Sequence, residues 1–161
     1  MSEVESYRER VAAVREALEA VPELGPGVPG PPDESTGERW DRTHVLGHVA
    51  EMLPFWTDQV RNLLSGATEF GRGEPGYARR REGIDAGPRL GEEELRRQIG
   101  QGLAGLQALL DDLRDEDLDR QVRYRAQSGD REVELRFPVE ELLVGHLEAH
   151  VRQLQELSIG G

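Results

Sequence analysis

The chain contains no cysteine. Disulfide bonds, thiolate metal ligands and cysteine nucleophiles are therefore excluded, and the composition is compatible with a reducing cytosol. The chain also lacks any run of about 18 apolar residues that could span a membrane, and its start, MSEVESYRER, has no basic segment followed by an apolar one. We expect a cytoplasmic protein without a membrane partner.

Lysine is absent as well. All 20 basic residues are arginines, and they stand against 32 aspartates and glutamates. The resulting formal net charge of −12 repels polyanions such as DNA. We therefore expect no nucleic-acid partner.

Apolar residues make up only 36% of the 161 residues, but they are grouped at helical spacing. The length suits one domain over residues 1–161. Spacings of three and four residues predict four helices, near 3–21, 41–65, 92–113 and 138–157. Two connections rich in glycine and proline, 22–35 and 66–90, are predicted as long loops.

The ends and interiors of these helices carry further signals. Asp41 is a suitable N-cap, and Pro138 suits a first helical turn. Gly100, Gly102 and Gly105 each cost about 1 kcal/mol relative to alanine inside a helix. We expect them where a neighbouring helix approaches closely.

Two short alternating stretches, 121–126 and 131–137, are separated by QSGD. This pattern predicts a small β-hairpin between the third and fourth helices. Because two strands alone are only marginally stable, the hairpin must pack on the helices. The expected fold class is all-α, a four-helix bundle with one hairpin.

His146 and His150 lie one turn apart in the middle of the apolar face of the last helix. Two imidazoles in this arrangement can bind Zn²⁺ or a similar ion together. His48, at the edge of the apolar face of the second helix, can supply a third nitrogen and leave a fourth coordination position open. The alternative is that the histidines are satisfied by hydrogen bonds in the core. His44 is expected at the surface, or paired with His48 in a second metal-binding unit.

Two further groups are candidates for functional roles. Glu51, one turn after His48, is a candidate base or partner of a metal ligand, with a solvated surface glutamate as the alternative. Arg79, Arg80 and Arg81 in the stretch 66–90 could bind a substrate carboxylate. The alternative for that stretch is a solvated surface loop.

Three segments together resemble the DinB/YfiT superfamily of metal-binding bundles, which includes the N-terminal domain of mycothiol-dependent maleylpyruvate isomerase. They are WDRTHVLGHVAEMLPFW, DEDLDRQV and FPVEELLVGHLEAHVRQL, and the resemblance covers nearly the whole chain. It implies a metal triad at His48, His146 and His150. It also implies an up-down-down-up four-helix bundle, a homodimer, and a low-molecular-weight bacterial thiol as a cofactor.

Two functions remain open at this point. The first is a metal-dependent enzyme that acts on a small molecule, in which zinc or nickel lowers the pKa of a bound thiol or activates a water. Its reaction would be a thiol-dependent transfer or isomerisation, or a hydrolysis. The second is a non-catalytic bundle that binds a ligand or a protein, with a structural metal or none.

Overall fold

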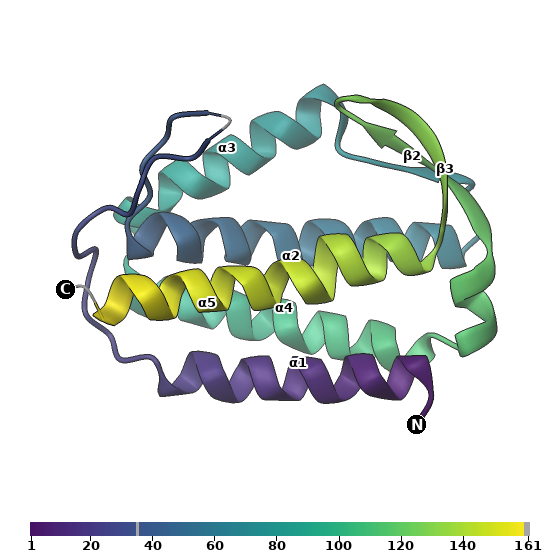
Figure 1. Cartoon of the computed structure of the whole chain (residues 1–161), viewed down its shortest axis with the longest axis horizontal. Coiled ribbons are helices and arrows are strands. Elements are labelled where there is room, and N and C mark those ends of the chain that lie inside the picture. Colours follow the sequence, from purple (N-terminus) through teal and green to yellow (C-terminus); the bar gives the residue numbers. More distant parts are fainter. Residues whose placement is uncertain (35, 160–161) are drawn as a thin grey trace.

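The computed structural model describes residues 1–34 and 36–159. Within them the chain is mostly helical and carries one small sheet (Figure 1). Its α-helices are α1 (Glu3–Ala20), α2 (Arg42–Leu64), α3 (Gly73–Leu90), α4 (Glu92–Asp112) and α5 (Gly145–Ile159). Its strands are β1 (Glu69–Phe70), β2 (Gln121–Ala126) and β3 (Gly129–Glu134).

Four of the helices match the four predicted segments. The Ser2 hydroxyl caps α1 by accepting from the Glu5 amide, and the Asp41 carboxylate caps α2 as expected. Pro138 stands at the first position of a π-helical segment, Pro138–Val144, which leads directly into α5. π-Helical turns are frequent near functional sites, and this one ends two residues before His146.

The stretch 66–90 is not the long loop that its composition predicts, because most of it forms α3. The glycines that resemble helix breakers lie where α3 packs on α2. A Cβ atom on Gly83 would lie 2.6 Å from the Cβ of Glu51, and one on Gly87 would overlap the Thr43 carbonyl oxygen. Close packing against α2 therefore offsets the entropic cost of glycine in this helix.

The expectation for the glycines of α4 is right at one position and wrong at two. A Cβ atom on Gly102 would lie 2.9 Å from the Cβ of Leu53 in α2, so a larger side chain is excluded there. Gly100 and Gly105 face open space, and no neighbouring helix requires a glycine at either position.

The sheet is larger than the predicted hairpin. β2 and β3 pair antiparallel, with Val122 opposite Val133 and a turn at 127–128, so β3 begins and ends earlier than expected. β1 pairs with β2 in parallel and adds a third strand that the sequence pattern does not reveal. The sheet lies at one end of the helices (Figure 1).

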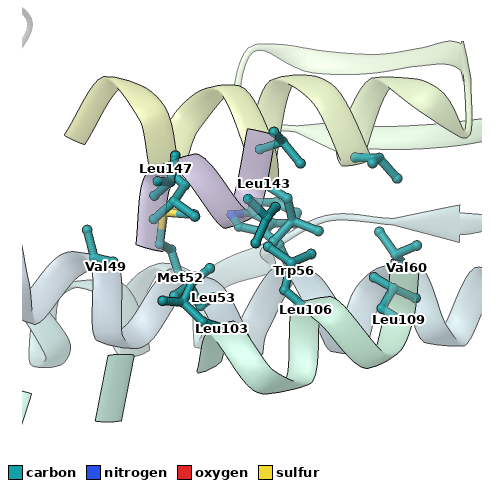
Figure 2. Packing of buried hydrophobic residues seen from close by; sticks show 14 of the residues in the cluster. Val49, Met52, Leu53, Trp56, Val60, Leu103, Leu106, Leu109, Leu143 and Leu147 are labelled. Atoms are coloured by element: carbon teal, nitrogen blue, oxygen red, sulfur yellow. The ribbon is translucent and has the colours of Figure 1, made fainter. Parts of the chain in front are cut away.

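The core lies where α2 packs against α4 and against the π-helical segment and α5. Figure 2 shows side chains from these elements meeting in one cluster: Val49, Met52, Leu53, Trp56 and Val60 from α2, Leu103, Leu106 and Leu109 from α4, and Leu143 and Leu147. α1 covers the core through its contacts with α4 and α5. Among the described helices, none combines the length and the apolar character needed to cross a membrane.

Candidate metal centre

The structure brings together the three histidines that were predicted to meet. His48 comes from α2, and His146 and His150 come from α5, and one ring nitrogen of each lies within 4.8 Å of the others. The Nε2 atoms of His48 and His146 are 3.4 Å apart. Two nitrogens bound to one tetrahedral zinc ion at about 2.05 Å would lie about 3.4 Å apart. The three residues therefore form a group that could hold a metal ion.

The ring nitrogens of this group are incompletely hydrogen-bonded. His150 Nδ1 donates to Gln153 Oε1 at 2.9 Å, which leaves a lone pair on Nε2. That Nε2 atom is buried without a hydrogen-bond partner, and so is Nδ1 of His48. The group has two hydrogen bonds, between His48 Nε2 and His146 Nε2 and between His150 and Gln153, so it is satisfied in part, and each nitrogen left unpaired costs about 1 to 3 kcal/mol. A second nitrogen fixed by a hydrogen bond is the usual arrangement of a metal-ligating histidine.

The surroundings keep all three imidazoles neutral. Burial is the largest cause in each case, and it lowers the pKa of His146 to about 3. The pKa of His48 is lowered by burial and by the two neighbouring histidines, and that of His150 by burial and by the charge of Arg80. Because only neutral imidazole can donate its lone pair to a metal, the group is ready to bind an ion at neutral pH.

A cavity of about 270 Å³ adjoins the three rings. The Trp40 ring forms part of its wall, with its centroid 5.4 Å from that of His48 and 6.1 Å from that of His150. Arg80 and Gln153 also line it, together with Pro31, Asp33 and Glu38 from the loop between α1 and α2. A metal ion on the histidines would therefore have room beside it for a small molecule.

The loop that carries Trp40 is fixed by one buried arginine. Arg42 is 1% exposed, and its guanidinium donates to the carbonyl oxygens of Pro22 and Gly25 at 2.6 and 2.7 Å. The same guanidinium makes a two-point ion pair with Glu92 at the start of α4. Buried charges persist only when they are paired in this way, so the contacts define where the loop lies.

Glu51 lies outside the histidine group. Its carboxylate accepts two hydrogen bonds from Arg72, at 2.6 and 3.0 Å, and it does not line the cavity. The Arg72 guanidinium is in turn 4.3 Å from the centre of the Phe55 ring. Glu51 is thus neither a partner of a metal ligand nor the solvated glutamate of the alternative expectation, but half of a buried ion pair.

Only one of the three predicted arginines reaches the cavity. Arg80 lines it, whereas Arg79 lies 3.6 Å from Glu51 and Arg81 is exposed on the outer side of α3. His44 also stays outside the histidine group. Its Nδ1 accepts from the Asp41 amide at 3.2 Å and so helps to cap α2.

Comparison of the chain with protein-family models, with curated proteins and with solved structures gave no match. The site is therefore defined by its own residues. Two of these, Trp40 and Gln153, were missed by sequence reasoning. Gln153 could have been found, because it lies three residues after His150 on the same helix face. Trp40 could not, since its place depends on how the loop folds back.

Proposed function

We propose that this protein is a metal-dependent enzyme that acts on a small molecule, with one divalent ion held by His48, His146 and His150. The observation that carries the proposal is the meeting of three neutral imidazoles, with unpartnered nitrogens, beside a cavity. Zinc and nickel are the first candidates, because both accept imidazole ligands readily. The ligand set leaves room for one further group on the cavity side, as in catalytic sites and unlike closed structural ones.

A divalent ion in this position would supply Lewis acidity, which lowers the pKa of a coordinated thiol or water. The chain's own residues prepare the site for it. Gln153 holds the His150 ring in one tautomer, and the Trp40 ring covers one side of the cavity and limits the access of water. Glu51 has no part in this proposal, because its carboxylate is already paired with Arg72.

We favour thiol-dependent transfer or isomerisation over hydrolysis. The chain has no cysteine, so a thiol would be brought by a low-molecular-weight cofactor, as the resemblance to the DinB/YfiT superfamily implies. The same resemblance leads us to propose that α1, α2, α4 and α5 form an up-down-down-up bundle, with α3 as an addition. We also propose that the protein is a cytoplasmic homodimer that binds a small molecule. It would bind neither nucleic acid nor a membrane.

The alternative is a non-catalytic bundle that binds a ligand or a protein around a structural metal. The observation that favours it is the extent of the apolar core, which can hold the helices together without any reaction at the histidines. The cavity beside the rings favours the enzyme hypothesis, because a structural ion needs no space for a second molecule.

The proposal can be tested with zinc- and nickel-loaded protein and a panel of electrophiles, each with and without an added bacterial thiol. We expect thiol consumption by the parent protein, an unchanged rate for His44→Ala and loss of activity for His150→Ala. The His44 variant is the matched control, because that histidine lies outside the group. Ester hydrolysis without thiol would favour the hydrolase. No turnover of any substrate by fully loaded protein would favour the non-catalytic alternative.

A further inference from the structure

Arg80 holds an unusual position among the arginines of this chain. It is half-buried in α3, it lines the cavity beside the three histidines, and its guanidinium carbon lies 5.8 Å from the centre of the Trp40 ring. Among the described residues, none of the carboxylates lies within ion-pair distance of it. Arg80 is therefore a cation of the cavity wall that forms no direct ion pair with a described carboxylate.

Half-buried Arg15 on α1 also has no ion pair with a described residue, but it lies outside the cavity, and several other arginines withdrawn from solvent are paired. Arg42 pairs with Glu92, Arg72 with Glu51, and Arg10 with two glutamates of the last helical region. With 32 acidic residues for 20 arginines, carboxylates are in excess over the whole sequence. A partly desolvated guanidinium without one is costly unless a ligand supplies the anion.

The charges around the cavity define where such an anion would go. Histidine ligands carry no negative charge, so a divalent ion held by three of them would keep its charge, and Arg80 adds another positive charge beside the same cavity. Asp33 and Glu38 also line the cavity, but both are exposed residues of the loop, and Glu38 accepts from the Trp40 indole nitrogen at 3.3 Å. Their negative charges disfavour an anion near the loop. The favourable position for an anion is therefore near α3.

We propose that Arg80 binds a carboxylate of the small molecule whose thiol reaches the metal, so that the site selects carboxylate-bearing thiols. This inference rests on the proposed function. A guanidinium presents its N–H groups as a planar fork that matches the two oxygens of a carboxylate. The volume of about 270 Å³ lies just below the usual range for small-molecule cavities, which suits a short molecule.

The test compares two short thiols on protein loaded with Co²⁺, whose visible spectrum changes when a thiolate coordinates. The first probe is 3-mercaptopropionate, which ends in a carboxylate, and the second is 2-mercaptoethanol, which ends in a neutral hydroxyl. For Arg80→Gln we expect about 10- to 100-fold weaker binding of 3-mercaptopropionate, the range of a lost charge-assisted hydrogen-bonded pair. The affinity for 2-mercaptoethanol should change by less than about threefold.

Two further variants serve as controls. Arg81→Gln removes the same charge from the same helix outside the cavity, and it should leave both affinities unchanged. Arg80→Lys keeps the charge without the two-point geometry, and it should recover part of the affinity for 3-mercaptopropionate. Cobalt stoichiometry of each variant checks that the site itself is intact.

The possible failures are distinguishable. If cobalt binds and both thiols change the spectrum, but Arg80→Gln weakens them equally or not at all, the inference is wrong and the proposed metal site stands. If the parent protein binds no cobalt, the proposed function and this inference are both overturned.

Discussion

Two buried polar clusters lie one turn apart on α2, and they differ in how completely they are paired. Glu51 and Arg72 satisfy each other through two short hydrogen bonds, and the Arg72 guanidinium packs on aromatic rings. In the histidine group, His48 and His150 instead each keep one buried nitrogen without a partner beside a cavity. The first cluster is a closed ion pair with a structural role. The second cluster still has nitrogens that could coordinate a metal ion.

The two clusters differ in the property that marks a buried polar group as functional. Burial alone is not the difference, because Glu51 and His48 are both buried, and yet both carboxylate oxygens of Glu51 are hydrogen-bonded to Arg72. The histidine group differs from the ion pair in having nitrogens without hydrogen-bond partners and a cavity beside them. Substitutions in the closed ion pair should therefore change the free energy of unfolding. Substitutions in the open histidine group should instead change ligand binding.

The largest expected effect belongs to the closed cluster. Replacing Arg72 with methionine leaves the Glu51 carboxylate buried without its partner, so the free energy of unfolding should fall by about 3 to 5 kcal/mol. Urea denaturation followed by circular dichroism measures this change. A loss below about 1 kcal/mol would show that the pair is not as closed as its geometry indicates.

Removal of the metal should have the next largest effect. Chelated protein should still unfold cooperatively, because the apolar core does not depend on the histidines. Free Zn²⁺ at 100 times its dissociation constant should then raise the free energy of unfolding by about 2.7 kcal/mol, and His150→Ala should abolish the gain. A chelated protein without a cooperative transition would indicate a structural ion.

The hydrogen bond from His150 to Gln153 can be tested separately. Gln153→Leu removes the acceptor that holds the ring, so the dissociation constant for Zn²⁺ should rise by about 10- to 100-fold. Competition with a chromogenic chelator measures it. Arg152→Leu, on the exposed side of the same helix turn, is the control and should leave the constant unchanged.

The close contact between Gly83 of α3 and the Glu51 side chain predicts a smaller loss of stability. Gly83→Ala places a methyl group against the Glu51 side chain and should cost about 1 to 3 kcal/mol. Gly105→Ala, in open space on α4, should instead stabilise the protein by about 0.5 to 1 kcal/mol. Thermal unfolding of the two variants gives opposite shifts, and shifts of equal sign would contradict the packing of α3 on α2.

The smallest effect is expected at the open cluster in metal-free protein. His48→Leu removes the buried Nδ1, which has no partner, together with the 3.4 Å contact of Nε2 with His146, and it keeps apolar volume, so it should change the free energy of unfolding by less than about 1 kcal/mol or raise it. The same urea experiment used for Arg72 measures it. A loss as large as that of Arg72→Met would show that His48 has a structural partner.

The elements with regular apolar spacing were predictable from the sequence, and so was the histidine group. His146 and His150 lie one turn apart on an apolar face, which directs both rings inward whatever the rest of the chain does. α3 was not predictable, because the glycines that argue against a helix are required only by contact with α2. Its stability comes from tertiary packing, which local spacing does not record.

The buried ion pairs were hidden for a related reason. Arg42 and Glu92, and likewise Glu51 and Arg72, are far apart in sequence, and each residue alone has the character of a surface charge. Their burial depends on a partner that another element supplies. For the same reason the sequence did not separate Arg80 from Arg79 and Arg81, because the course of α3 alone decides which of them lines the cavity.

The most direct test of the account is the number of metal ions bound per chain. Calorimetric titration of chelated protein with Zn²⁺, checked by elemental analysis, should give one ion for the parent and for His44→Ala. It should give none at the same concentrations for His48→Ala, His146→Ala or His150→Ala. A parent protein that binds no ion, or a His150→Ala variant that binds as tightly as the parent, would contradict the claim that these three side chains form a metal site.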